Sequence, residues 1–459
     1  MNAITEIGAQ GFTRRLAAAA AALRWEDVPA PARQVAAQAV LDTIGCTLAG
    51  AGEPVAEALL AELAEAGGAP QAGVIGAGAI GRAARLPATS AALLNGAAGH
   101  ALDFDDVNMA MPGHPSVAIL PALLALGEAR GASGAAVLTA LVAGTELACR
   151  VGRVMAPGHY DGLGFHATAT LGCLGAAAAC ARLMGLDAET TAVALGIAVT
   201  QAAGLKSMFG TDCKPLHAGA AARTGLLAAK LASRGFTARS DAIECAQGFA
   251  ATHSPDFHPG RAADPAPGGF HILANLFKYH AACYLTHAPI EAARVLASRP
   301  GVAPERIAAV RLTLSEACDR VCNIPAPRTG LEAKFSLRLT TAMALAGVET
   351  GALASYSETT AADPQLVSLR DKVTFDFRPD RAHTLADLEL VLDDGTRLAA
   401  RHDSGVPAAD LDEQGRRLGA KFHVLAAPVL GEARADALAA RLVTLEAEPD
   451  IGAVLALAA

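Results

Sequence analysis

One short segment concentrates the side chains that can carry out acid/base chemistry. It reads His100-Ala-Leu-Asp103-Phe-Asp105-Asp106, and His114-Pro-Ser follows eight residues later, so three carboxylates and two imidazoles lie within fifteen residues. Burial shifts the pKa of such groups by whole units, so they are costly to fold around unless they have partners, a metal or a catalytic task. This segment is therefore our first candidate for an active site.

Two simpler interpretations of the segment stay open. In the first, it is a solvated acidic loop in which Asp105 and Asp106 cap the next element. In the second, His100, Asp103, Asp106 and His114 ligate a divalent metal ion, for which carboxylate and imidazole groups are suitable ligands. Because no recognised ligand spacing occurs, we expect no metal at the site.

Three further segments place basic groups just before or within apolar helical sequence. They are Gly164-Phe-His166-Ala-Thr168, Thr211-Asp-Cys-Lys214-Pro-Leu-His217-Ala-Gly219 and Phe277-Lys278-Tyr-His280-Ala-Ala-Cys283-Tyr-Leu-Thr-His287. A single histidine or lysine in such a place is more often a structural residue with a hydrogen-bond partner or a solvated end. Their occurrence together with the acidic segment favours a common site.

Helical periodicity must position these groups, and it extends from residue 12 to about 235. The end signals of helices fit this periodicity. The expected signals are Pro31 and Gly50 for one helix, Ser133 and Asp187 as N-caps, Pro87 and His100 for the helix before the acidic loop, and Gly235 after the segment Ala218–Arg234.

A turn-rich stretch near 260–270 precedes sequence of a different kind. Strands are expected at Ile307–Leu314 and Lys372–Phe377, and a hairpin is expected across Asp394-Gly395 between Leu388–Leu392 and Arg397–Arg401. Helical periodicity returns after Pro407. The predicted fold is mainly α, with a large all-helical domain at 1–267, an inserted α+β domain at 268–405, and C-terminal helices at 406–459 that complete the helical domain.

Composition excludes several classes of protein. The chain has 459 residues, 52% of them hydrophobic, which makes two domains the reasonable expectation. A formal net charge of -8 and the lack of a dense Lys/Arg stripe argue against nucleic-acid binding. Nine cysteines without CxxC pairs are typical of reduced, buried thiols. The N-terminus has no signal-peptide pattern, and the apolar runs at 165–181 and 190–205 are shorter than a bilayer span, so we expect a cytoplasmic protein.

The segment Gly76-Ala-Gly78-Ala-Ile-Gly81 matches the GxGxxG pattern of dinucleotide-binding folds. Such a site needs a βαβ unit in a parallel sheet, whereas the flanking sequence is helical throughout. We therefore expect no nucleotide and no other organic cofactor.

The sequence resembles the MmgE/PrpD family, which includes 2-methylcitrate dehydratase, cis-aconitate decarboxylase and iminodisuccinate epimerase. The resemblance spans nearly the whole chain. Its motifs are Leu41-Asp42-Thr43-Ile44-Gly45-Cys46, Asn95-Gly-Ala-Ala-Gly-His100-Ala-Leu-Asp-Phe-Asp-Asp106, His114-Pro-Ser116, Leu120-Pro-Ala-Leu-Leu-Ala125, Lys214-Pro-Leu-His-Ala-Gly219, Lys278 with His287, Glu332-Ala-Lys-Phe-Ser336 and Lys421-Phe422.

The resemblance implies a homodimer whose helical and lid domains enclose a positively charged cleft. It implies catalytic roles for the residues that match the pocket of the family, which are Asp103, His114, His166, Lys214 and Lys278. Substrate contacts are expected from Asn108, His217 and Cys283. Two positions depart from relatives: Val107 replaces a threonine after the acidic triplet, and Cys283 replaces a histidine of the decarboxylase, which disfavours decarboxylation.

The predicted function is that of a metal-independent lyase that dehydrates a small hydroxylated di- or tricarboxylate. The two lysines would stabilise negative charge next to a carboxylate, His114 and His166 would serve as base and acid, and Asp103 would orient an imidazole. Three alternatives remain: an epimerase acting next to a carboxylate, a cis-aconitate-type decarboxylase, and a degenerate member that only binds a carboxylate. The expected partners are a small anionic substrate and a second copy of the chain, with no nucleic acid and no membrane.

Overall fold

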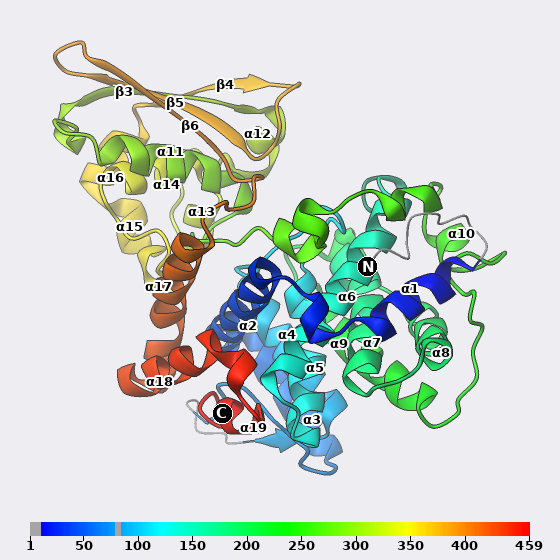
Figure 1. Ribbon diagram of the computed structural model, residues 1–459. Helices are drawn as coiled ribbons and strands as arrows, with labels where there is room; N and C mark the ends of the chain where they lie inside the picture. The colour runs from blue at the N-terminus through cyan, green and yellow to red at the C-terminus, as the bar shows by residue number, and fades with distance from the viewer. Residues whose placement is uncertain (1–10, 79–83) are drawn as a thin grey trace. The chain divides into compact units, whose positions relative to one another are not determined.

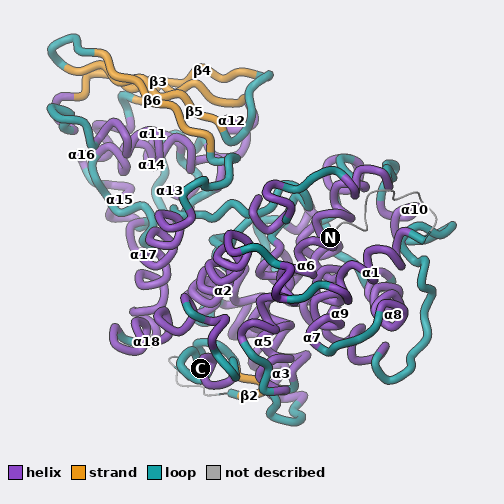
Figure 2. Tube along the Cα trace, viewed as in Figure 1, coloured by secondary structure: helices purple, strands orange, loops and turns teal. Residues whose placement is uncertain are grey.

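The computed structural model describes residues 11–78 and 84–459, and the chain divides into two compact units. The larger unit comprises the chain up to Phe277 together with Ala409–Ala459, and the smaller unit is Lys278–Ala408. The sequence placed the corresponding boundaries after residues 267 and 405. Helices predominate, and the four-stranded sheet belongs to the smaller unit (Figures 1 and 2), so the mainly α fold class is confirmed.

Helices make up most of the larger unit (Figure 1). They are α1 (Phe12–Ala22), α2 (Ala30–Gly50), α3 (Pro54–Ala66), α4 (Ala88–His100), α5 (Pro115–Arg130), α6 (Gly134–Met155), α7 (Ala167–Leu183), α8 (Ala188–Val199), α9 (Cys213–Ala232), α10 (Phe249–His253), α17 (Leu411–Leu430), α18 (Glu432–Val443) and α19 (Gly452–Leu455). This unit is not all-helical as predicted, because the two-residue strands β1 (Ala72–Gly73) and β2 (Arg85–Leu86) pair in it.

The end signals of the helices act as the sequence predicts. Ser133 Oγ accepts a hydrogen bond from Ala136 N at 3.3 Å at the start of α6, and Asp187 Oδ1 accepts one from Thr190 N at 2.8 Å at the start of α8. Such N-caps satisfy backbone N–H groups that have no partner within the helix. Gly235, with φ +80°, follows the end of α9, where a left-handed residue suits glycine.

Glycines let α4 and α9 cross with almost no side chain between them. A Cβ on Gly96 would lie 2.7 Å from the Cα of Gly219, and a Cβ on Gly219 would lie 2.0 Å from the carbonyl oxygen of Leu93. No side chain fits at such separations, so only glycine permits this approach. The crossing fixes the end of α4, which carries His100, relative to the start of α9, which carries Lys214.

The GxGxxG segment lacks the setting of a dinucleotide site. The strand β1 that precedes it pairs antiparallel with β2, within a ribbon of two strands. Residues 79–81 of the segment lie outside the described part of the chain. A dinucleotide fingerprint requires a parallel strand that leads into a helix, and the described residues form no such unit here.

The longest apolar helix is α6, rather than the segments at 165–181 and 190–205. Its length and composition would allow it to cross a membrane, but 89% of its most apolar window is buried within the protein. Core helices pass the same test of composition. The apolar residues of α6 therefore pack inside the larger unit.

The smaller unit has one face of a four-stranded sheet covered by helices (Figure 1). The strand order is β4-β3-β5-β6, with β3 and β4 parallel and the other neighbours antiparallel. The strands are β3 (Ile307–Ser315), β4 (Val373–Arg378), β5 (Leu385–Leu392) and β6 (Arg397–Asp403), and the helices are α11 (His287–Ala297), α12 (Glu316–Cys322), α13 (Gly330–Lys334), α14 (Leu337–Leu345), α15 (Glu358–Ala362) and α16 (Pro364–Arg370). Both predicted strands and the predicted hairpin are therefore present.

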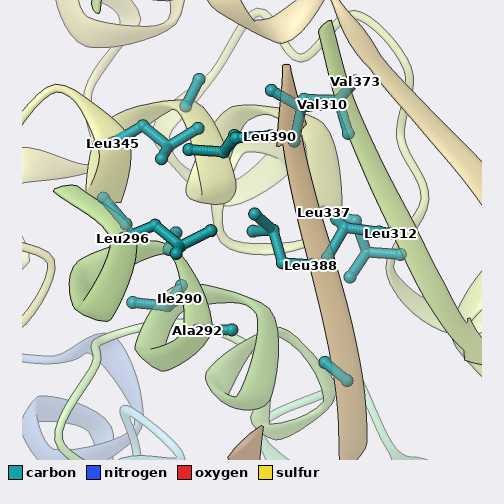
Figure 3. Close-up of a cluster of buried hydrophobic side chains, with 14 of the residues drawn as sticks. Ile290, Ala292, Leu296, Val310, Leu312, Leu337, Leu345, Val373, Leu388 and Leu390 are labelled. Atoms are coloured by element: carbon teal, nitrogen blue, oxygen red, sulfur yellow. The ribbon is translucent and has the colours of Figure 1, made fainter. Parts of the chain in front are cut away.

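Side chains that alternate between the two faces of the strands place apolar residues in the core of this unit. Leu388 and Leu390 of β5 point toward Ile290 and Leu296 of α11, and Leu345 of α14 completes the layer (Figure 3). All five are nearly or fully buried. Because side chains alternate between the faces of a strand, the other face of the sheet keeps its charged residues in water.

Candidate active site

The acidic loop connects α4 to α5 in the larger unit, and both of its ends carry histidines. His100 is the last residue of α4, and His114 is the N-cap residue of α5. Between them, Asp103 adopts a left-handed backbone conformation with φ +50°. Aspartate tolerates this region better than most residues, and the local reversal of the chain turns successive carboxylates toward different neighbours.

Asp105 lies between the two histidines. His100 Nδ1 is 2.9 Å from Asp105 Oδ1, and His114 Nδ1 is 3.0 Å from Asp105 Oδ2. The side chains of His100 and Asp105 are fully buried, while 11% of the His114 side chain is exposed. Burial alone would raise the pKa of Asp105, but the two imidazoles outweigh burial and hold this pKa well below the usual range. Burial lowers the pKa of His100 to about 4, although Asp105 opposes that shift.

Asp103 lies between a lysine and an imidazole. Its Oδ1 accepts a hydrogen bond from Lys214 Nζ at 2.8 Å and lies 3.6 Å from His114 Nε2, beyond hydrogen-bond distance. The Asp103 side chain is 47% exposed, and that of Lys214 is 15% exposed. The role of Asp103 in orienting an imidazole stays a prediction, and Asp105 lies nearer to His114.

His166 and His217 add two imidazoles to the same group. His166 is the N-cap residue of α7, and its Nδ1 lies 3.1 Å from Nδ1 of His217 in α9. Ring centroids place His166 6.0 Å from His100, which is in turn 4.6 Å from His114. Burial, with smaller contributions from His100 and Lys214, lowers the pKa of His166 well below its usual value.

Phe209 closes one side of this imidazole group and was not singled out from the sequence. Its ring meets that of His166 edge-on at 4.9 Å, and Lys214 Nζ lies 5.6 Å from its centroid. Although it is aromatic, Phe209 remains 39% exposed. An apolar surface next to a lysine and an imidazole suits a ligand that combines a carboxylate with a short hydrocarbon part.

Asp106 and Asn108 brace the loop from inside. Asp106 accepts hydrogen bonds from Ser116 Oγ and Asn275 Nδ2, both at 2.6 Å, and from Ser116 N at 3.3 Å. Burial raises the pKa of Asp106 to about 8, against the effect of the Ser116 hydrogen bonds. Asn108 Nδ2 donates to Asn275 Oδ1 and to His271 O. A substrate contact by Asn108 would have to displace one of these bonds.

A buried ion pair supports the loop from behind. Lys421 Nζ in α17 lies 2.6 Å from Asp42 Oδ1 in α2 and 2.6 Å from the carbonyl oxygen of Phe104. The ammonium group also lies 3.9 Å from the centroid of the Phe104 ring. Both residues stood in motifs that carry the resemblance, but the sequence gave no sign that they meet, because 379 positions separate them.

Lys278 and Cys283 belong to the smaller unit. Lys278 is its first residue and is 2% exposed. Cys283, which is partly buried, packs against the core of that unit, where the Cys322 thiol of α12 interacts with it. The four other predicted catalytic residues and His217 come together in the larger unit, whereas the roles of Lys278 and Cys283 stay predictions.

The residues that could ligate a metal in the structure differ from the predicted set by one aspartate. His100, Asp103, Asp105 and His114 each offer one ligand atom within 4.8 Å of the others, while Asp106 is not part of this group. The ammonium group of Lys214 already provides a positive charge 2.8 Å from Asp103. The arrangement can therefore act without a metal, through imidazoles for proton transfer and an ammonium group for an anion.

Comparison with known proteins agrees with this arrangement. The family profile of the MmgE/PrpD N-terminal domain matches residues 14–262, and that of the MmgE/PrpD C-terminal domain matches residues 280–445. The cis-aconitate decarboxylase of Homo sapiens is 32% identical over 337 residues, which cover 70% of this chain and 69% of that protein. The cis-aconitate decarboxylase of Aspergillus terreus is 30% identical over 305 residues, which cover 63% of this chain and 61% of that protein. The matches extend over both units, and they show that the chain belongs to the MmgE/PrpD family.

Proposed function

We propose that this protein is a metal-independent lyase that acts on a small di- or tricarboxylate by removing a group next to a carboxylate. The observation that carries the proposal is the convergence of His114, His166 and Lys214 around Asp103 and Asp105. Imidazoles transfer protons near neutral pH, and a fixed ammonium group stabilises an anionic intermediate. The curated relatives named above, which are carbon–carbon lyases by name, support a lyase in general.

For the particular reaction we propose dehydration of a hydroxylated acid similar to 2-methylcitrate. His114 Nε2 takes the proton from the carbon next to a carboxylate, and the electron pair left on that carbon spreads into the carboxylate. Lys214 stabilises the resulting negative charge. A protonated His166 then gives its proton to the hydroxyl group on the neighbouring carbon, the carbon–oxygen bond breaks, water leaves, and a carbon–carbon double bond forms.

Decarboxylation of a substrate similar to cis-aconitate is the second candidate, because the curated relatives carry that name. In that reaction the carbon–carbon bond to a carboxylate breaks, carbon dioxide leaves, and a proton is added to the carbon that keeps the electron pair. The resemblance puts Cys283 where the decarboxylase has a histidine, and this departure disfavours decarboxylation. For this reason we place dehydration first.

Proton NMR in D₂O tests both candidates at once. The purified, EDTA-treated protein is incubated with 2-methylcitrate, citrate, cis-aconitate and iminodisuccinate. Loss of water from a hydroxy acid supports the first candidate, and formation of itaconate from cis-aconitate supports the second. Deuterium exchange with inversion and no leaving group would replace both with an epimerase.

Two controls show whether the turnover belongs to this site and is metal-free. The variants His166→Ala and Lys214→Ala must lose the turnover that the wild type shows. Activity that EDTA abolishes and a divalent ion restores would instead support the metal hypothesis. A panel that binds but never turns over would indicate a carboxylate-binding member of the family. We further propose a cytoplasmic homodimer, for which sedimentation equilibrium tests the oligomeric state.

A further inference from the structure

The neighbourhood of Asp105 contains buried atoms that lack hydrogen bonds. Among the described residues, Asp105 Oδ2, His114 Nδ1 and His100 Nε2 are buried and have no hydrogen-bond partner. Yet Asp105 Oδ2 and His114 Nδ1 are only 3.0 Å apart, so the distance suits a hydrogen bond while the direction of the N–H group does not. A buried acceptor without an aligned donor is destabilising, so this contact can gain strength when the N–H group turns toward the carboxylate.

Protonation of His114 would strengthen the contact between Nδ1–H and Asp105. An imidazolium N–H directed at an ionised carboxylate forms a charge-assisted hydrogen bond, which is roughly twice as strong as a neutral one. Asp105 is fully buried, so little water competes for its charge. The two atoms already lie at hydrogen-bond distance, so only the direction of the N–H group has to change.

Asp105 also determines which nitrogen of His114 faces the substrate. Since an ionised carboxylate only accepts hydrogen bonds, the hydrogen of neutral His114 belongs on Nδ1, beside Asp105. The lone pair is then on Nε2, which lies on the side of half-exposed Asp103. This is the nitrogen that a base must present to a substrate entering from solvent.

His100 contacts the other carboxylate oxygen of Asp105. Its Nδ1 donates to Oδ1 at 2.9 Å, which fixes the plane of the carboxylate and keeps Oδ2 directed at His114. Asp103 cannot replace Asp105 in this task, because its nearer partner is Lys214 at 2.8 Å. Of the two aspartates, Asp105 lies nearer to His114, at 3.0 Å from Nδ1 against 3.6 Å between Asp103 and Nε2.

We propose that Asp105 and His100 form a buried positioning pair that holds His114 with Nε2 toward the substrate and stabilises its protonated form. The proposal rests on the proposed function, in which His114 accepts the substrate proton. In that step the proton moves from the substrate carbon to Nε2, and the carbon keeps the electron pair. The positive charge of the imidazolium is then shared with Asp105 through Nδ1–H.

The kinetic test compares Asp105→Asn with Asp264→Asn, two changes of the same size and charge within the larger unit. Asp105→Asn lowers kcat by about 10²–10⁴ with little change in KM, and it moves the acid limb of the kcat/KM profile to lower pH, because the base loses its carboxylate. Asp264→Asn, whose carboxylate contacts Arg153 at 2.9 Å, leaves that limb in place. An unchanged acid limb in Asp105→Asn would overturn the proposal, since a merely structural role does not move it.

A second readout does not depend on turnover. Nitrogen-15 NMR of labelled histidines reports which ring nitrogen carries the hydrogen, and His100→Gln and His114→Gln assign the two signals. We expect the Nδ1–H form for both histidines in the wild type and its loss at His114 in Asp105→Asn. If His114 keeps this form without the carboxylate, the positioning role is wrong even if no substrate is ever found.

If Asp105→Asn does not fold, as judged by circular dichroism, the same kinetic and NMR measurements on His100→Gln test the positioning pair. Glutamine still donates to Asp105 through its amide, so this variant loosens the carboxylate without removing its charge. We expect kcat to fall by about 10-fold, the smaller effect of a group that acts through another. Unchanged kcat and an unchanged His114 signal would contradict the role of His100.

Discussion

A Cβ atom on Gly219 of α9 would lie 2.0 Å from the carbonyl oxygen of Leu93 in α4. We therefore expect Gly219→Ala to push the two helices apart and to lower the free energy of unfolding by about 1–3 kcal/mol or more. Activity falls as well, because the same crossing holds Lys214 near Asp103. Urea unfolding and steady-state kinetics measure the two effects.

Gly419→Ala in α17 is the matched control for that substitution. A Cβ on Gly419 meets nothing within 4 Å, and its backbone is not left-handed. Because alanine favours the helical state, this variant gains about 0.5–1 kcal/mol of unfolding free energy. Equal effects of the two substitutions would contradict the packing explanation.

Lys421→Met removes the cation of a buried ion pair and leaves Asp42 charged inside the protein. We expect the free energy of unfolding to fall by about 3–5 kcal/mol, as measured by denaturant titration. The double variant Lys421→Met with Asp42→Leu regains much of this loss, because no charge then stays buried. A single variant as stable as the wild type would show that the pair contributes little.

Lys214→Ala tests the ammonium group of the site. We expect kcat/KM to fall by about 10²–10³, the usual effect of losing one stabilising donor for a developing anion. Lys206→Ala is the control, since Lys206 Nζ donates to Tyr160 O at 3.1 Å, outside the proposed machinery. Circular dichroism must show both variants folded, and similar losses in both would point to a general effect of surface charge.

The buried His100 makes stability depend on pH. Its pKa is lowered from 6.5 to about 4 in the folded protein, so its contribution is present above pH 6.5 and is lost as pH falls toward 4. We expect a loss of up to about 3 kcal/mol in unfolding free energy from this residue. Urea titrations at several pH values compare the wild type with His100→Gln, and parallel pH curves would contradict the assignment.

Local signals in the sequence predict much of this fold, and nonlocal contacts account for what they miss. The caps Ser133 and Asp187 and the Asp394-Gly395 turn act through neighbouring residues, so periodicity and turn chemistry locate them well. The role of Asp105 was not predictable, because it depends on the φ of +50° at Asp103, which no residue pattern displays. Three carboxylates on one loop look alike in sequence and differ only in which neighbour each one meets.

The link between Lys421 and the carbonyl of Phe104 sets an order on assembly. As the chain leaves the ribosome, the acidic loop and both of its flanking helices emerge long before α17 does. Until then Asp42 and the loop lack their cation, and the smaller unit must be synthesised in between. The last part of the chain to be made therefore completes the site, so a chain that is cut short before α17 retains every predicted catalytic residue and lacks the support that holds the loop.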